Sequence, residues 1–177
     1  MKTRVLILLL LPLLYLMQSC DDPKTAHKYD NETTVDVMGL NFIGSAAEAG
    51  HTEIRAAKIA VKVSTNPRVL SFAKMMIHDH TLAGEKLDNL KTRELISGPF
   101  ASTEAHQEMV DTLGKLSGTD FDKAYINWMV WSHEKAVSLF REGAENRDNA
   151  VQNYALQTLP TIKMHLDSAK NILASLK

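Results

Sequence analysis

One pattern occurs twice in this sequence and constrains the fold more than any other feature. The segments 72–87 (FAKMMIHDHTLAGEKL) and 125–140 (YINWMVWSHEKAVSLF) align without a gap. Both place an aromatic residue, a methionine, a histidine, an alanine and a large apolar residue at steps of three and four. Side chains at these steps share one face of an α-helix. Both segments are therefore predicted to be helices with a histidine, His80 or His133, in the middle of the apolar face.

The same spacing extends over most of the chain and predicts an all-α fold. Long helices are predicted over 41–63, 67–94, 120–145 and 149–176, with a short helix over 102–116. No stretch alternates like a strand, and aromatic residues make up only 6% of the sequence. The natural solution is a four-helix bundle over residues 39–177, with a short crossover helix between its second and third long helices.

Local signals predict where these helices start and bend. Asn66 and Pro67 are the expected N-cap and first residue of one helix. Thr119 and Asp122 resemble a capping box at the start of another. Pro160 lies inside the last helix and is expected to kink it or to split off its first turns.

The first nineteen residues have the features of a secretory signal peptide. A basic start precedes an apolar run over 5–17, which is too short to cross a bilayer of ~30 Å. The segment that follows this run ends at Cys20, the only cysteine, in a pattern that resembles a bacterial lipobox. That resemblance implies cleavage before Cys20, attachment of a lipid to it and a flexible tether over residues 20–38. Ordinary signal cleavage that leaves a free Cys20 is the alternative.

The acidic pair Asp21-Asp22 after the cysteine resembles export signals of Bacteroidetes-type lipoproteins. It implies an outer-membrane lipoprotein that faces either the periplasm or the outside. The membrane, reached through the lipid on Cys20, is then the one expected partner, since no motif indicates a protein partner.

Several function classes are not supported. The net charge is −1 and no basic run is present, so we do not expect nucleic-acid binding. The sequence contains no glycine-rich phosphate loop, C-x-x-C, G-x-S-x-G or H-E-x-x-H. An enzyme is therefore not the preferred interpretation.

Each long helix carries one ionisable residue in its apolar row: Glu53, His80, His133 or His165. All four lie close to the middle of their helices. At a rise of ~1.5 Å per residue they fall within about one turn of a common level. Because bundle helices pack ~8–10 Å apart, the four side chains are expected to meet.

Two interpretations of this cluster remain open. Glu53, His80, His133 and His165 could bind one transition-metal ion (Zn, Fe, Mn or Cu). Asp79 would then orient one of the imidazoles without binding the ion itself. Alternatively, the four groups satisfy one another as a buried hydrogen-bonded network in a structural or protein-interaction module. The thioether sulfurs of Met76 and Met129 keep copper among the possible ions, although packing in the core also explains these two residues. A haem pocket lacks a supporting axial-ligand motif.

The remaining polar residues near the cluster lack this support. Glu48 and His78 are predicted to lie at the surface. No helical row includes His27, His51 or His106 as a site residue.

Three ordered blocks resemble the domain-of-unknown-function 4142 family: FAKMMIHDHTLAGEKL, LSGTDFDKAYINWMVWSHEKAVSLF and LPTIKMHLDSAKNIL. The resemblance covers residues 40–176 and implies a ferritin-like four-helix bundle in a bacterial envelope protein with no assigned activity. Ferritin-like di-iron sites use Glu-x-x-His on two helices, whereas Ile77 and Val130 stand three residues before the two histidines here. The resemblance therefore implies the ferritin-like fold and not a ferroxidase.

Overall fold

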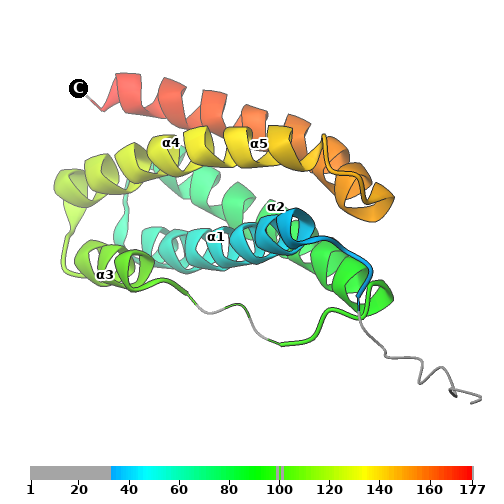
Figure 1. Ribbon diagram of the computed structural model, residues 1–177. Coiled ribbons are helices and arrows are strands. Elements are labelled where there is room, and N and C mark those ends of the chain that lie inside the picture. The colour runs from blue at the N-terminus through cyan, green and yellow to red at the C-terminus, as the bar shows by residue number, and fades with distance from the viewer. Residues whose placement is uncertain (1–32, 99, 101, 177) are drawn as a thin grey trace, which may run out of the picture. The chain divides into compact units, whose positions relative to one another are not determined.

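The computed structural model describes residues 33–98, 100 and 102–176, and every regular element among them is a helix (Figure 1). The helices are α1 (Val37–Val63), α2 (Pro67–Arg93), α3 (Glu104–Leu113), α4 (Gly118–Gly143) and α5 (Asn149–Ser175). The predicted all-α fold is confirmed. The signal peptide, Cys20 and most of the predicted tether lie outside the described residues. None of the described helices is long and apolar enough to span a bilayer.

The four long helices form two antiparallel hairpins. One hairpin is α1–α2 and the other is α4–α5, and the hairpins join where α1 packs on α4 and α2 packs on α5. The connection from α2 to α4 runs back along the bundle, with α3 packed against α1 (Figure 1). As a result, α2 and α4 run in the same direction. This is the predicted ferritin-like four-helix bundle with a short crossover helix.

The helix starts agree only in part with the sequence signals. Asn66 accepts hydrogen bonds from the first backbone N–H groups of α2, as predicted. Helix α1 begins at Val37, earlier than the predicted residue 41, because the Asp36 carboxylate accepts the Gly39 N–H at 2.7 Å. Val37 and Met38, placed by the sequence analysis at the end of the tether, are therefore helical.

The predicted capping box was wrong, and one of the two outcomes predicted at Pro160 does not occur. Helix α4 starts at Gly118, whose φ of +57° favours glycine, after an N-cap Ser117 that makes no side-chain capping bond. The predicted capping residue Asp122 is buried instead. Helix α5 is continuous from Asn149 to Ser175, so Pro160 does not split off its first turns.

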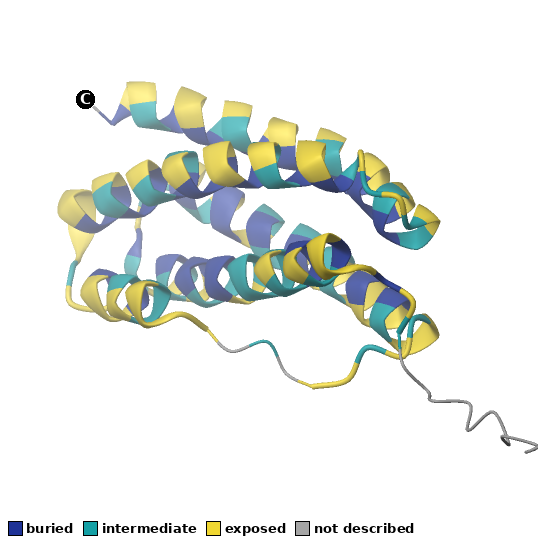
Figure 2. Ribbon diagram, viewed as in Figure 1, coloured by how far each residue is buried: buried dark blue, intermediate teal, exposed yellow. Residues whose placement is uncertain are grey.

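The buried faces of the long helices point at one another (Figure 2) and form two apolar clusters. We name each cluster after its tyrosine. The main large side chains of the Tyr125 half are Phe72, Met76, Phe121, Tyr125 and Met129. Those of the Tyr154 half are Phe42, Leu87, Phe140, Tyr154 and Ile162. Along every long helix, the ionisable residue predicted for the site lies between the residues of the two halves.

Candidate metal centre

The four predicted side chains are all buried and form a polar layer between the two apolar halves. His133 and His165 are fully buried, and Glu53 and His80 are 1% and 6% exposed. The register explains this placement. Along α2, His80 lies one turn after Met76 and two turns before Leu87. Along α4, His133 lies one turn after Met129 and one turn before Ala136.

The Glu53 carboxylate contacts three side chains from two neighbouring helices. The Ser132 hydroxyl donates to its Oε1 at 2.6 Å. The Nδ1 atoms of His80 and His133 lie 3.3 and 3.4 Å from its two oxygens. Ser132 was not among the predicted site residues. Its position three residues after Met129, on the same apolar row, was the available signal.

The other two histidine contacts fix the orientation of the rings. His133 Nδ1 lies 2.9 Å from the Met129 carbonyl oxygen, which can only accept, so this nitrogen carries the proton. His165 Nε2 lies 2.9 Å from Asp79 Oδ2. Asp79, predicted to orient an imidazole, therefore contacts His165 from the neighbouring helix and not its sequence neighbour His80.

These contacts leave one nitrogen free on each ring: His80 Nε2, His133 Nε2 and His165 Nδ1. All three are buried and have no hydrogen-bond partner among the described residues. The ring centroids are 5.2–5.7 Å apart, and one nitrogen from each ring lies within 4.8 Å of the other two. With the protons on the opposite nitrogens, each ring keeps one buried lone pair that has no partner among the described residues. Such unpaired polar atoms are costly in an apolar core.

The electrostatics favour a neutral imidazole at His80 and at His165 and an ionised Glu53. Burial lowers the pKa of His80 to about 4, despite the opposing effect of Glu53. Burial also lowers the pKa of His165 and outweighs the contact with Asp79. For Glu53, burial alone would raise the pKa, but His133, His80 and Ser132 together hold it below the ordinary value. Neutral imidazole is the form that binds metal ions.

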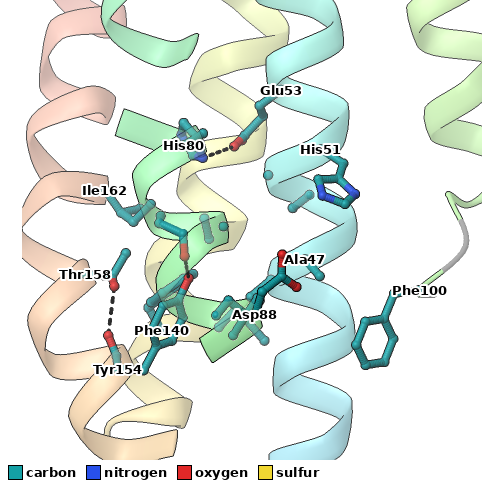
Figure 3. Close-up of a pocket in the computed structure, with 18 of the residues that line it drawn as sticks. Ala47, His51, Glu53, His80, Asp88, Phe100, Phe140, Tyr154, Thr158 and Ile162 are labelled. Atoms are coloured by element: carbon teal, nitrogen blue, oxygen red, sulfur yellow. Dashed lines mark hydrogen bonds and ion pairs between the residues drawn. The ribbon is translucent and has the colours of Figure 1, made fainter. Parts of the chain in front are cut away.

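A cavity of about 200 Å³ reaches this layer from the Tyr154 half (Figure 3). Glu53 and His80 lie at one end of it, and Tyr154 and Phe140 lie towards the other end (Figure 3). Its exposed lining residues include His51 on α1 and Asp88 on α2, so it opens between these two helices.

Of the other residues weighed in the sequence, His78 and Glu48 supply none of the three free nitrogens, and His27 lies outside the described residues. His78 is exposed, as predicted. Glu48, predicted to lie at the surface, is half-buried. Its carboxylate accepts a hydrogen bond from the Thr103 N–H at 2.8 Å and lies 2.6 Å from His106 Nδ1. The prediction for Glu48 was wrong because its partners lie more than fifty residues away in sequence, at the start of α3. Glu48 and His106 thus attach α3 to α1.

The family of the chain can now be stated. A family profile described as "Domain of unknown function (DUF4142)" matches residues 24–172. The chain belongs to the DUF4142 family. Comparison with curated proteins finds no match.

Solved structures share the fold of this DUF4142 protein at low sequence identity. A DUF305 fragment from Deinococcus radiodurans superposes with a TM-score of 0.71 at 15% identity, covering 80% of this chain and 98% of that one. A DUF305 protein from Streptomyces coelicolor has a TM-score of 0.66 at 12% identity, covering 78% and 93%. CopM in its Cu(II)-bound form has a TM-score of 0.66 at 15% identity, covering 78% and 97%.

Proposed function

We propose that this DUF4142 protein binds one divalent transition-metal ion in the middle of its bundle, through His80, His133 and His165. The proposal is carried by three neighbouring imidazoles, one nitrogen of each lying within 4.8 Å of the others, that each keep a buried nitrogen without a partner among the described residues. An ion at ~2.0–2.1 Å from each nitrogen requires them to lie roughly 3.3 Å apart, so side-chain shifts of about 1 Å complete the site.

The surroundings of the three rings suit a dication. Carboxylates stand behind the imidazoles, Glu53 against His80 and His133 and Asp79 against His165. Carboxylates in this position fix the tautomer and raise the basicity of metal-binding histidines. Their two negative charges balance the two positive charges of the ion. In this proposal Glu53 orients ligands, in place of its predicted role as a fourth ligand, because Ser132 and the two Nδ1 atoms already contact its oxygens.

The donor set narrows the predicted list of Zn, Fe, Mn and Cu. Imidazole nitrogen suits Zn²⁺ and Cu²⁺ better than Mn²⁺, which prefers oxygen. The Cu(II)-bound state of the structural neighbour CopM supports copper as one of the ions to test.

We further propose that the protein acts in the cell envelope, as a lipoprotein of the outer membrane. The lipobox-like sequence that ends at Cys20 and the acidic pair after it support this location. A lipid on Cys20 would attach the metal-binding bundle to the membrane surface.

Elemental analysis of the protein, purified without chelator, tests metal binding directly. About one transition-metal ion per chain is expected, and it should be lost in His80→Ala and in His133→Ala. His51→Ala is the control, because His51 is exposed and contributes none of the three free nitrogens. Circular dichroism verifies that each variant is folded. Equal metal content in all four proteins would refute the proposal.

A structural role for the polar layer is the second candidate. Its support is that Glu53–Ser132, Glu53–His133 and Asp79–His165 all join one hairpin to the other. A folded protein that ignores added Zn, Cu, Fe and Mn would favour this role, and the layer would then serve only to fix helix pairing.

A further inference from the structure

We propose that the cavity between α1 and α2 is the passage by which the ion reaches the three histidines. This inference rests on the proposed metal function. It adds a defined entry route to that site.

The metal centre is buried, so a route is needed. His133 and His165 are 0% exposed, and the free nitrogens of all three rings are inaccessible. On the side of the Tyr125 half, fully buried Met76 and Met129 stand one turn from His80 and His133. On the opposite side, the cavity reaches the polar layer itself (Figure 3).

Small residues keep this route open. The walls near the polar layer are formed largely by alanine and glycine: Ala46, Ala47, Ala49, Gly50, Ala83 and Gly84. A Cβ added at Gly84 would meet no atom within 4 Å. A volume of about 200 Å³ has room for several water molecules, so an entering ion can keep part of its hydration shell.

Polar groups occur along the route. Asp88 and His51 are exposed at the opening, although Lys91 Nζ lies 3.4 Å from Asp88 and partly offsets its charge. The Tyr154 and Thr158 side chains line the interior. Each donates its hydroxyl proton to a backbone carbonyl, which leaves the oxygen lone pairs available to a cation or its water.

Glu53 lies between the cavity and the site. It lines the cavity, and its oxygens contact Nδ1 of His80 and of His133. The inner end of the cavity therefore adjoins two of the three imidazoles.

Blocking the passage should slow metal exchange without changing the equilibrium. Gly84→Leu places a side chain in the cavity from α2, and Ala47→Leu does so from α1. Loading with ZnCl₂ is followed by stopped-flow, release is followed with a colour-forming chelator, and the Kd is measured by competition. We expect loading and release both to slow by roughly tenfold or more in each variant, with a Kd within about twofold of the unsubstituted protein.

Two controls on α2 separate blocking from other effects. Glu85→Leu adds the same side chain at an exposed neighbouring position, and Gly84→Ala changes helix propensity while adding one methyl group. Both should load at the unsubstituted rate. Loading at that rate in Gly84→Leu and Ala47→Leu would overturn the passage while leaving the metal site intact. Failure of added Zn²⁺, Cu²⁺, Fe²⁺ and Mn²⁺ to bind the unsubstituted protein would instead refute the proposed function, and the passage with it.

Discussion

The Tyr125 half and the Tyr154 half lie against the same polar layer but are filled differently. Each contains three aromatic rings: in the Tyr125 half Phe121 stacks on Tyr125 at 5.7 Å, and in the Tyr154 half Phe42 meets Phe140 edge-on at 5.2 Å. Close to the layer, however, the Tyr125 half presents methionines and the Tyr154 half presents small residues and a cavity. One side of the layer is closed and the other is hollow.

This difference is already present in the repeated sequence pattern. In both copies a methionine precedes the histidine by four residues, at Met76 and Met129, and an alanine follows it by three, at Ala83 and Ala136. Because α2 and α4 run in the same direction, both methionines enter the Tyr125 half and both alanines face the Tyr154 half. The repeat thus produces one packed side and one open side, and the open side is the one through which the site can be reached.

The largest expected effect comes from truncating the closed half. Phe121 is fully buried, so Phe121→Ala should lower the free energy of unfolding by about 4 kcal/mol. In the hollow half, Ala136→Val adds methyl groups beside the cavity and should change it by less than about 1 kcal/mol. Urea unfolding of the two variants measures both. A cost of several kcal/mol for Ala136→Val would show that the hollow half is packed as tightly as the closed one.

Acid should act on the polar layer that separates the halves. The pKa of His80 falls from 6.5 to about 4 on folding, so between these values the unfolded chain binds a proton that the folded chain does not. The free energy of unfolding therefore decreases as the pH falls, by about 3 kcal/mol between about pH 6.5 and pH 4. Denaturant unfolding of the metal-free protein across this range measures the loss.

Matched variants identify the group responsible for the acid effect. His80→Asn should flatten the pH dependence, whereas His51→Asn should leave it unchanged. His165, whose pKa is also lowered by burial, and acidic groups such as Glu48, whose pKa is lowered by its contacts with Thr103 and His106 despite burial, account for the residual slope. Equal slopes in the two variants would assign the effect to groups other than His80.

The smallest effects compare two glycines. Gly84→Ala should stabilise the protein by about 0.5–1 kcal/mol, because alanine favours the helix and its Cβ enters open space. Gly143→Ala, at the far end of the Tyr154 half, should destabilise by about 1–3 kcal/mol, because its Cβ would lie 2.5 Å from the Phe42 ring. Thermal unfolding compares the melting temperatures of the two variants. If Gly84→Ala lowered the melting temperature, the space beside Gly84 would not be open.

The fold and the membership of the polar layer could be predicted because both depend on periodicity. Three- and four-residue spacing identifies the buried face of each helix, and helix length fixes the depth of each residue. Glu53, His80, His133 and His165 were found in this way, without knowledge of which helices are neighbours.

The details that depend on three-dimensional contacts could not be predicted. Which ring nitrogen is free follows from the partner of the other nitrogen, such as the Met129 carbonyl or Asp79, and helical spacing does not specify these distances. The Glu48–His106 contact joins residues 58 apart, on two helices whose mutual packing is not specified by the periodicity of either. The cavity results from small residues on two different helices, each of which is an ordinary core residue when read alone.

The polar layer also joins two parts of the chain that could otherwise move as units. His80 belongs to the α1–α2 hairpin, and His133 and His165 belong to the α4–α5 hairpin. An ion bound to all three would be lost whenever the hairpins separate, and separation would become rarer as the free ion concentration rises. Hydrogen exchange at the ends of the helices, far from the layer, would then report how much ion is available.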